Sequence, residues 1–419
     1  MFRFTDHIIG QMTLGCNLNC KYCYEGLHSK DNQKMLSVSD FKKAFDTYVY
    51  ERCVLGSIEN QVKWHFHGGE PLLYDKKDLV ECIKYIKRRR KCFPNVSYCI
   101  QSNGLLLDDV LASFFAKEGV TIGISFDGFK TDERMVESAN DALIEKLRKF
   151  KSNYGTNFGC LSVLTKNNIR DWFSDMQRTQ DVFSDCGINI LCPAKGKEND
   201  VPTADEQWEY WLKPCLESFL TEHPIMERYV RICIERFLTY DILKTVKDSP
   251  YKTGCFDRIC GHGVNMISVK PDLTVYNCDK YMETGDHIEE RPVYFINQRD
   301  FLGLQQIKRY IHYCDDLFKL ENEHHCDLCP YSYLCLGGCQ SYNKSMTGEV
   351  DFDFDMCTIY EKIYNFLRMH WMQIFEKHTF QTLFQIEDIN PIYLQEMRLF
   401  GYRPVIDLDK NLFHIEKER

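Results

Sequence analysis

The chain has 419 residues with 44% hydrophobic content, which is enough for two or three domains with sizeable cores. Its net charge of −9 argues against nucleic acid as the main partner, because phosphate binding needs a basic face. No apolar run approaches the roughly 20 residues that span a bilayer, and the N-terminus has no secretory signal pattern. We therefore expect a soluble, cytoplasmic protein with no nucleic-acid or membrane partner.

Strand-like apolar runs alternate with amphipathic helical stretches through the first half of the chain. The predicted strands are 8–14, 62–66, 96–101, 120–126, 158–164 and 188–192, and the predicted helices are 39–53, 77–90, 108–118, 139–151 and 171–184. Six alternations predict an α/β fold with a parallel sheet built of βαβ units. A closed eight-unit barrel needs two more, so we expect an open, partial (β/α)6 barrel that binds ligands at the carboxyl ends of its strands.

Three cysteines, Cys16, Cys20 and Cys23, follow the first predicted strand in a CxxxCxxC spacing. A [4Fe–4S] cluster is normally held by four cysteines, so three leave one iron open to a substrate or cofactor. A structural zinc site is the alternative, but it would want a fourth nearby ligand, for which His28 is the close candidate. Disulfides would need an oxidising compartment. The spacing therefore favours an iron–sulfur cluster with an open iron.

Polar and glycine-rich segments follow the next three predicted strands. HFHGGEPLL ends the second strand, QSNG the third and ISFDG the fourth. Paired glycines let a backbone approach a ligand without obstruction by a Cβ, although on their own they also fit a tight strand-to-helix turn.

Together, the CxxxCxxC and GGEP motifs resemble those of radical SAM enzymes, which cleave S-adenosylmethionine reductively to a 5′-deoxyadenosyl radical. The resemblance includes an aromatic residue directly before the third cysteine, and it implies the partial-barrel fold as well. The arginine downstream of ISFDG is Arg134, for which the alternative to a cofactor contact is a charge on the surface of a helix. The resemblance implies that S-adenosylmethionine is contacted by Tyr22, Gly68, Gly69, Glu70, Asn103, Ser125 and Arg134.

A second cysteine field begins after residues 203–247, which carry helical apolar stripes. It contains eight cysteines, the number that fully ligates two [4Fe–4S] clusters, and an alternating stretch with a Pro-Asp turn that predicts a β-hairpin. A zinc ribbon is the competing interpretation. The arrangement resembles the SPASM domain of radical SAM enzymes that modify peptides and proteins. That resemblance implies one cluster on Cys255, Cys260, Cys278 and Cys339, nearer the active site, and an outer cluster on Cys326, Cys329, Cys335 and Cys357.

The chain is predicted to divide into four parts. These are a radical SAM partial barrel (1–202), a helical bridge (203–254), a SPASM domain with two auxiliary clusters (255–360) and a C-terminal helix and tail (361–419). The tail contains a stretch that fits an edge hairpin. The aromatic stripe of its helix is more typical of a core than of a docking surface.

The leading functional hypothesis is an enzyme with three [4Fe–4S] clusters that removes hydrogen from a ribosomally made peptide. The product would be a crosslink, a thioether or an oxidised residue, and an external donor such as flavodoxin or ferredoxin would supply electrons. In the relatives that mature sulfatases, an aspartate at the position of Asp279 is proposed to take a proton from substrate, which is general base catalysis. The alternative for Asp279 is a turn cap.

Two other functions stay open. One is anaerobic sulfatase maturation, the oxidation of cysteine or serine to formylglycine, although CYEG and HGGEPLL depart from the forms typical of those maturases. The other is an iron–sulfur electron carrier, which has no need of an open iron.

Overall fold

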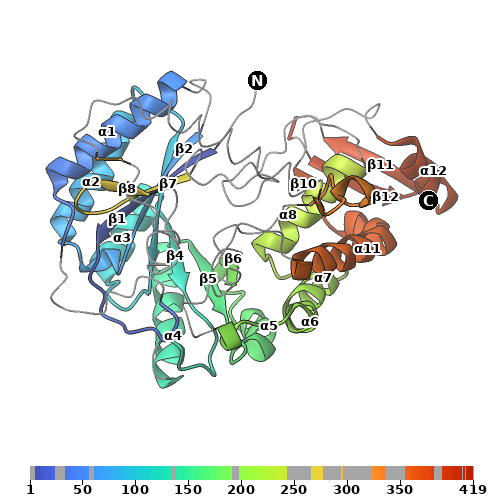
Figure 1. Ribbon diagram of the computed structural model, residues 1–419, viewed down its shortest axis with the longest axis horizontal. Helices are drawn as coiled ribbons and strands as arrows, with labels where there is room; N and C mark the ends of the chain where they lie inside the picture. Colours follow the sequence, from blue (N-terminus) through green and yellow to red (C-terminus); the bar gives the residue numbers. More distant parts are fainter. Residues whose placement is uncertain are drawn as a thin grey trace.

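The computed structural model is built around a nine-stranded sheet with the order β6-β5-β4-β3-β2-β1-β7-β8-β9 (Figure 1). The first six strands each pair in parallel with their neighbours, which confirms the predicted α/β class. They are β1 (Thr5–Thr13), β2 (Gln61–Gly68), β3 (Val96–Ser102), β4 (Thr121–Ser125), β5 (Phe158–Leu164) and β6 (Phe183–Ile190). The structure describes residues 5–23, 34–55, 61–134, 137–190, 198–242, 266–276, 294–295, 323–335, 354–381, 389–407, 409–410 and 412–418.

Five helices connect these strands. They are α1 (Val38–Leu55), α2 (Lys76–Arg89), α3 (Asp109–Glu118), α4 (Glu137–Tyr154) and α5 (Ile169–Arg178). Aspartates cap the N-termini of α2 and α3: Asp75 accepts from Lys77 N, and Asp108 accepts from Leu111 N. Such caps satisfy backbone N–H groups that have no partner inside the helix.

The fifth helix is shorter, and the sixth strand longer, than the sequence predicts. Instead of running to residue 184, α5 ends at Arg178, where the Thr179 hydroxyl donates to the carbonyl oxygens of Asp175 and Met176. The N–H groups of Val182 and Phe183 then turn back to Thr179 O. As a result, β6 starts at Phe183 rather than at residue 188. The buried residues Val182 and Phe183 lead into this strand instead of continuing the helix.

The two faces of the sheet differ in burial. Along β2 and β3 every second residue is fully buried, and the residues between them are half-exposed. The buried set packs under the helices, where Trp64 and Phe66 meet Phe41 and Phe45 of α1. The alternate residues, which are only partly exposed, form what we call the concave face. Because the helices cover the other face, we expect ligands on this one.

The predicted hairpin extends this sheet at its β1 edge. It consists of β7 (Met266–Val269) and β8 (Thr274–Tyr276), which pair antiparallel, and β9 (Tyr294–Phe295) follows. β7 runs parallel to β1, with His7 opposite Met266. The sequence predicts the hairpin as part of a cysteine-rich domain, and the structure adds that it is joined to the barrel sheet.

The C-terminal half contributes a helical layer and a small second sheet (Figure 1). Helix α11 (Phe354–Lys377) contacts α6 (Ala204–Gln207), η3 (Trp208–Leu212), α7 (Lys213–Ser218) and α8 (Arg228–Arg236). Its aromatic stripe is buried, which confirms the core interpretation; Tyr360, Tyr364, Trp371 and Phe375 are its members. The remaining elements are η4 (Phe237–Ile242), β10 (Phe380–Gln381), α12 (Pro391–Leu399), β11 (Tyr402–Asp407) and β12 (Leu412–Lys417).

The predicted C-terminal hairpin is present as β11 and β12, which pair antiparallel in a three-stranded sheet with β10. Three short 3-10 turns also occur, η1 (Pro71–Leu73), η2 (Glu198–Asp200) and η6 (Cys326–Leu328). None of the helices that the structure describes is both long and apolar enough to cross a membrane.

Candidate cluster and cofactor site

The cysteine loop, residues 15–23, starts at the carboxyl end of β1 and packs against the GGEP segment at the end of β2. Gly69 N donates to Thr13 O at 2.8 Å, and Glu70 N donates to Gly15 O at 2.9 Å. A Cβ on Gly69 would collide with the Gly15 carbonyl, and Gly68 has a φ of +127° that side chains rarely allow. The two glycines therefore permit backbone-to-backbone contact between the motifs.

Glu70 ties three strand ends together. Its carboxylate is buried and accepts from Leu72 N (2.9 Å), from the Ser102 hydroxyl (2.7 Å) and from Asn103 N (2.8 Å). Burial raises the pKa of this carboxyl group, and these hydrogen bonds oppose the rise. The Asn103 side-chain amide in turn donates to Asn17 Oδ1 at 2.8 Å. The ends of β2 and β3 are thus linked to the cysteine loop.

Asp127, directly beyond β4, is the centre of a second buried network. Its carboxylate accepts from Val163 N at 2.8 Å and from the Tyr22 hydroxyl. It also pairs with Arg134, whose Nε lies 3.2 Å from Oδ2, while both side chains are largely buried. Removing a single partner from a buried pair of this kind leaves an uncompensated charge. Arg134 is therefore an interior residue and not a surface charge.

Arg134 connects this network to the cluster ligands. Its guanidinium lies over the Tyr22 ring, 5.4 Å from the centroid, and its Nη1 is 3.8 Å from Cys20 Sγ. The buried charge of Asp127 raises the pKa of Arg134 even though burial itself lowers it. A permanent cation thus stands beside a cysteine sulfur.

The three thiols of the loop differ in exposure. Cys20 is buried, whereas Cys16 and Cys23 are partly exposed. Burial raises the pKa of the Cys16 and Cys20 thiols, while Leu18 N donates to Cys16 Sγ at 3.4 Å and Arg134 favours the Cys20 thiolate. N–H donors and a cation beside the sulfurs fit an anionic iron–sulfur cluster, because hydrogen bonds to sulfur and nearby charge are how a protein tunes one.

The described part of the chain shows neither a disulfide nor a preformed site for a single metal ion. The cysteines whose side chains the structure describes are not cross-linked to one another. Within the same residues no three His, Cys, Asp or Glu side chains are grouped to hold a single metal ion.

The predicted cofactor residues lie at the carboxyl ends of the strands. Tyr22, Glu70, Asn103 and Arg134 belong to the two networks, and Gly68 and Gly69 lie against the backbone of residues 13–15. Ser125 lies at the end of β4, where its hydroxyl accepts from Gln101 Nε2 at 2.9 Å. Sequence reasoning missed Asp127, Asn17 and Ser102. Asp127 had a signal, because a carboxylate between two phenylalanines in SFDGF must be buried and therefore paired.

The second cysteine field is described only in part. Cys326, Cys329 and Cys335 lie on one segment, residues 323–335, and Cys357 lies near the start of α11. Arg236 of α8 donates to the carbonyl oxygens of Leu334 (3.1 Å), Tyr333 and Cys335 (both 3.4 Å). The Tyr364 hydroxyl of α11 also donates to Leu334 O, at 2.9 Å. Four predicted ligands, Cys255, Cys260, Cys278 and Cys339, and the predicted base Asp279 lie outside the described residues.

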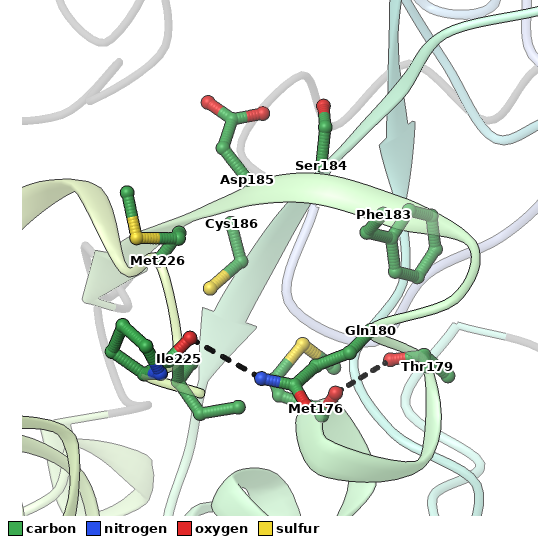
Figure 2. Close-up of a pocket in the computed structure, with 10 residues that line it drawn as sticks. Met176, Thr179, Gln180, Phe183, Ser184, Asp185, Cys186, Ile225 and Met226 are labelled. Carbon is green, nitrogen blue, oxygen red and sulfur yellow. Dashed lines mark hydrogen bonds between the residues drawn. The ribbon is translucent and has the colours of Figure 1, made fainter. Parts of the chain in front are cut away.

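A separate pocket of about 200 Å³ lies at the start of β6 (Figure 2). Gln180 Nε2 donates to Pro224 O across it at 3.2 Å, and Phe183, Cys186 and Met226 line it. Because β6 starts here, the pocket belongs to the end of the sheet opposite the cysteine loop. It is therefore not part of the candidate cluster site.

Comparison with known proteins agrees with this geometry. Residues 11–176 match the model of the Radical SAM superfamily, so this part of the chain is similar to a radical SAM domain. The chain is 24% identical over 350 residues to the cysteine-type anaerobic sulfatase-maturating enzyme of Clostridium novyi, covering 80% of this chain and 87% of that protein. An uncharacterised protein of Methanocaldococcus jannaschii is 32% identical over 167 residues, and the match spans about half (54%) of its length.

Two solved structures share the fold. Native anSMEcpe with bound AdoMet and Cp18Cys peptide has a TM-score of 0.64 at 19% identity, covering 88% of this chain and 99% of that chain. Streptococcus suis SuiB bound to precursor peptide SuiA has a TM-score of 0.55 at 14% identity, covering 84% and 76%. The expected resemblance to radical SAM enzymes, and among them to sulfatase-maturating enzymes and peptide maturases, is therefore confirmed.

Proposed function

We propose that this radical SAM enzyme uses S-adenosylmethionine to remove hydrogen from a ribosomally made peptide, leaving a crosslink, a thioether or an oxidised residue. The observation that carries the proposal is the placement of Cys16, Cys20 and Cys23 at the carboxyl end of β1, beside the buried Arg134–Asp127 pair. Three cysteines leave one iron of a cluster open. An iron–sulfur protein that only carries electrons does not need an iron with an open coordination position.

The cluster and S-adenosylmethionine supply the radical chemistry when bound, and the chain supplies positioning and exclusion of water. Arg134 provides a fixed positive charge next to Cys20 Sγ, suited to an anionic cluster and to the carboxylate of S-adenosylmethionine. Tyr22 is held by its hydrogen bond to Asp127 and covers one side of Arg134. Asn103 and Ser125, at neighbouring strand ends, are the further polar contacts we assign to S-adenosylmethionine.

The second cysteine field is proposed to be a SPASM domain within residues 255–360, between a helical bridge (203–254) and the tail (361–419). It would hold two further [4Fe–4S] clusters, making three in all, and an external donor in the cytoplasm, such as flavodoxin or ferredoxin, would supply electrons to the enzyme. Asp279, which follows the proposed ligand Cys278, would act as a general base if it reaches the substrate.

Sulfatase maturation is an equally supported alternative. It is favoured by the sulfatase-maturating relatives, which the chain matches over most of its length. The peptide-maturation reading is favoured by the fold shared with SuiB and by the departures in CYEG and HGGEPLL. In both cases the substrate is a peptide or protein.

One experiment separates the two. The anaerobically reconstituted enzyme is incubated with S-adenosylmethionine, reductant and either a peptide containing a sulfatase active-site cysteine or the short peptide encoded beside its gene. Mass spectrometry then follows each peptide. Peptide maturation predicts loss of two hydrogens from the encoded peptide alone. Conversion of the sulfatase cysteine to an aldehyde would establish the alternative, and the absence of 5′-deoxyadenosine with an intact, reduced cluster would reject both.

A further inference from the structure

A hydrogen-bonded chain of three side chains crosses the concave face of the sheet, separate from the cofactor residues. Cys99 Sγ of β3 lies 3.2 Å from His65 Nδ1 of β2, and His65 Nε2 lies 2.7 Å from His7 Nδ1 of β1. His65 and Cys99 are directly opposite each other in the strand register. The chain uses both nitrogens of His65 and one nitrogen of His7.

The positions of the protons in this hydrogen-bonded chain depend on the charge states of Cys99, His65 and His7. Burial lowers the pKa of His7 to about 4 and that of His65 well below its usual range, and it raises the pKa of the Cys99 thiol. All three groups are therefore neutral near pH 7. We assign the protons in the order in which the protonated Cys99 thiol donates to His65 Nδ1 and His65 Nε2–H donates to His7 Nδ1. His7 then carries its proton on Nε2.

The His7 Nε2 atom is the open end of the chain. It is buried and has no hydrogen-bond partner among the residues that the structure describes. Leaving a buried donor unpaired is costly, and such groups in native proteins call for a specific explanation. The group that completes this chain must accept a hydrogen bond.

The surroundings select an anionic acceptor. Lys63 is on the same face of β2 and directly opposite His7 in the register, and its charge, with that of Arg228, helps to keep His7 and His65 neutral. Arg228 Nη2 lies 3.2 Å from Asp185 Oδ2. Lys63 has no carboxylate within ion-pair distance among the described residues, so one positive charge of this face stays uncompensated there.

On β5 and β6, glycines leave room for the Asp185–Arg228 pair against the strand backbone. A Cβ on Gly159 of β5 would lie within 3.0 Å of Asp185 Oδ1, and one on Gly187 of β6 would lie 3.3 Å from Arg228 Nη1. The Asp185–Arg228 pair therefore rests against the backbone of β5 and β6 without larger side chains at these two positions. Cys99 precedes Asn103 by four residues along the chain, which places the three side chains about 13 Å along the strands from that proposed S-adenosylmethionine contact.

We propose that His7 and Lys63 form a binding site for a carboxylate group of the substrate, one oxygen accepting from His7 Nε2–H and the other pairing with Lys63. Cys99 and His65 are positioning residues, since they fix the His7 proton on the nitrogen that faces the ligand. The identification of the ligand with the peptide substrate rests on the proposed function; the carboxylate site itself does not. Peptides with an acidic residue or free C-terminus near the modified residue are the expected substrates.

The first test uses acetate as the probe, with the full-length, anaerobically reconstituted protein labelled at histidine Cε1. NMR spectra are recorded during titration with sodium acetate, with sodium chloride and acetamide as controls, and His7→Gln assigns the His7 signal. We expect a saturable shift of the His7 signal with acetate alone. Lys63→Gln should weaken acetate binding about tenfold, whereas Lys77→Gln, on the exposed side of α2, should leave it unchanged. Equal shifts with chloride or acetamide would overturn the site.

The second test asks whether the carboxylate belongs to the peptide. Acetate should raise the KM for peptide modification without lowering kcat, and replacing the peptide's carboxylates by amides should raise KM and abolish the acetate effect. A KM insensitive to both changes would overturn the assignment to substrate. Failure of the wild-type enzyme to form 5′-deoxyadenosine would instead count against the proposed function, because acetate binding is measured without turnover.

Discussion

The cysteine loop (residues 15–23) and the segment 323–335 both carry predicted cluster ligands, but they are held in different ways. The cysteine loop is held by backbone contacts such as Glu70 N to Gly15 O and, in addition, by buried side-chain charges. Arg134 reaches Cys20 Sγ, and Asp127 holds both Arg134 and Tyr22. The segment 323–335 is fixed through its backbone, because Arg236 and Tyr364 donate to the carbonyl oxygens of residues 333–335.

This difference indicates a division of labour. A cation directly at a sulfur changes the electronic properties of a cluster and can also meet an anionic cofactor. Donors to backbone carbonyls fix the position of a segment. We infer that the first site is arranged for chemistry and the second for a structural or electron-transfer role, and the following variants test that contrast.

The largest effect is expected at Cys20. Cys20→Ala removes one of three cluster ligands, so the iron open to S-adenosylmethionine is lost and 5′-deoxyadenosine should fall below detection by chromatography. Cys92→Ala is the matched control, because Cys92 is an exposed free thiol and should leave the rate unchanged. Wild-type rates in the Cys20 variant would show that the cluster is elsewhere.

The next largest effect concerns the second field. Asp279→Asn should lower modified peptide by about 10²–10⁴-fold, the usual contribution of general base catalysis, while 5′-deoxyadenosine formation continues. The two products are measured in the same reaction by mass spectrometry. Asp272→Asn, in the hairpin turn where its carboxylate accepts from Thr274, is the control. Unchanged product would remove Asp279 from the mechanism.

Asp127→Asn tests the charge network of the first segment. It leaves the buried Arg134 guanidinium without its counter-charge, so we expect the free energy of unfolding to fall by about 3–5 kcal/mol, measured by denaturant titration of the apoprotein. Asp132→Asn breaks a pair with Lys21 that is exposed on both sides and should cost at most about 1 kcal/mol. Similar losses in both variants would contradict the role of buried charge.

Arg236→Met tests the backbone anchoring of the second segment. We expect a loss of about 1–3 kcal/mol because buried carbonyls lose their donor, together with lower iron content, while S-adenosylmethionine cleavage is retained. Arg403→Met removes a surface ion pair with Glu416 and serves as the control. A selective loss of 5′-deoxyadenosine in the Arg236 variant would break the proposed division between the segments.

Much of the barrel was predictable because its signals are local. Apolar runs, helix caps and the motifs at strand ends each depend on a few neighbouring residues, so the parallel sheet follows from the sequence. The set that contains Tyr22, Glu70 and Asn103 came from the resemblance of those motifs to radical SAM enzymes. The start of β6 was missed because Val182 and Phe183 fit a helical stripe as well as a strand. In the structure, Thr179 ends the helix before them.

The side-chain networks were not predictable in the same way. Asp127 meets Tyr22 across 105 positions of sequence, and the chain of His7, His65 and Cys99 forms only when three strands align. No local pattern records such contacts, because they depend on strand register. The attachment of the hairpin β7–β8 to β1 is a long-range pairing of the same kind.

The central claim is that one cluster with an open iron operates beside two fully ligated clusters. Iron and sulfide analysis with Mössbauer spectroscopy, on the anaerobically reconstituted wild type and on a variant with Cys16, Cys20 and Cys23 all changed to Ala, tests it most directly. We predict three [4Fe–4S] clusters in the wild type, and in the variant two, with no binding of S-adenosylmethionine. A wild type that holds one iron–sulfur cluster and stoichiometric zinc would contradict the account.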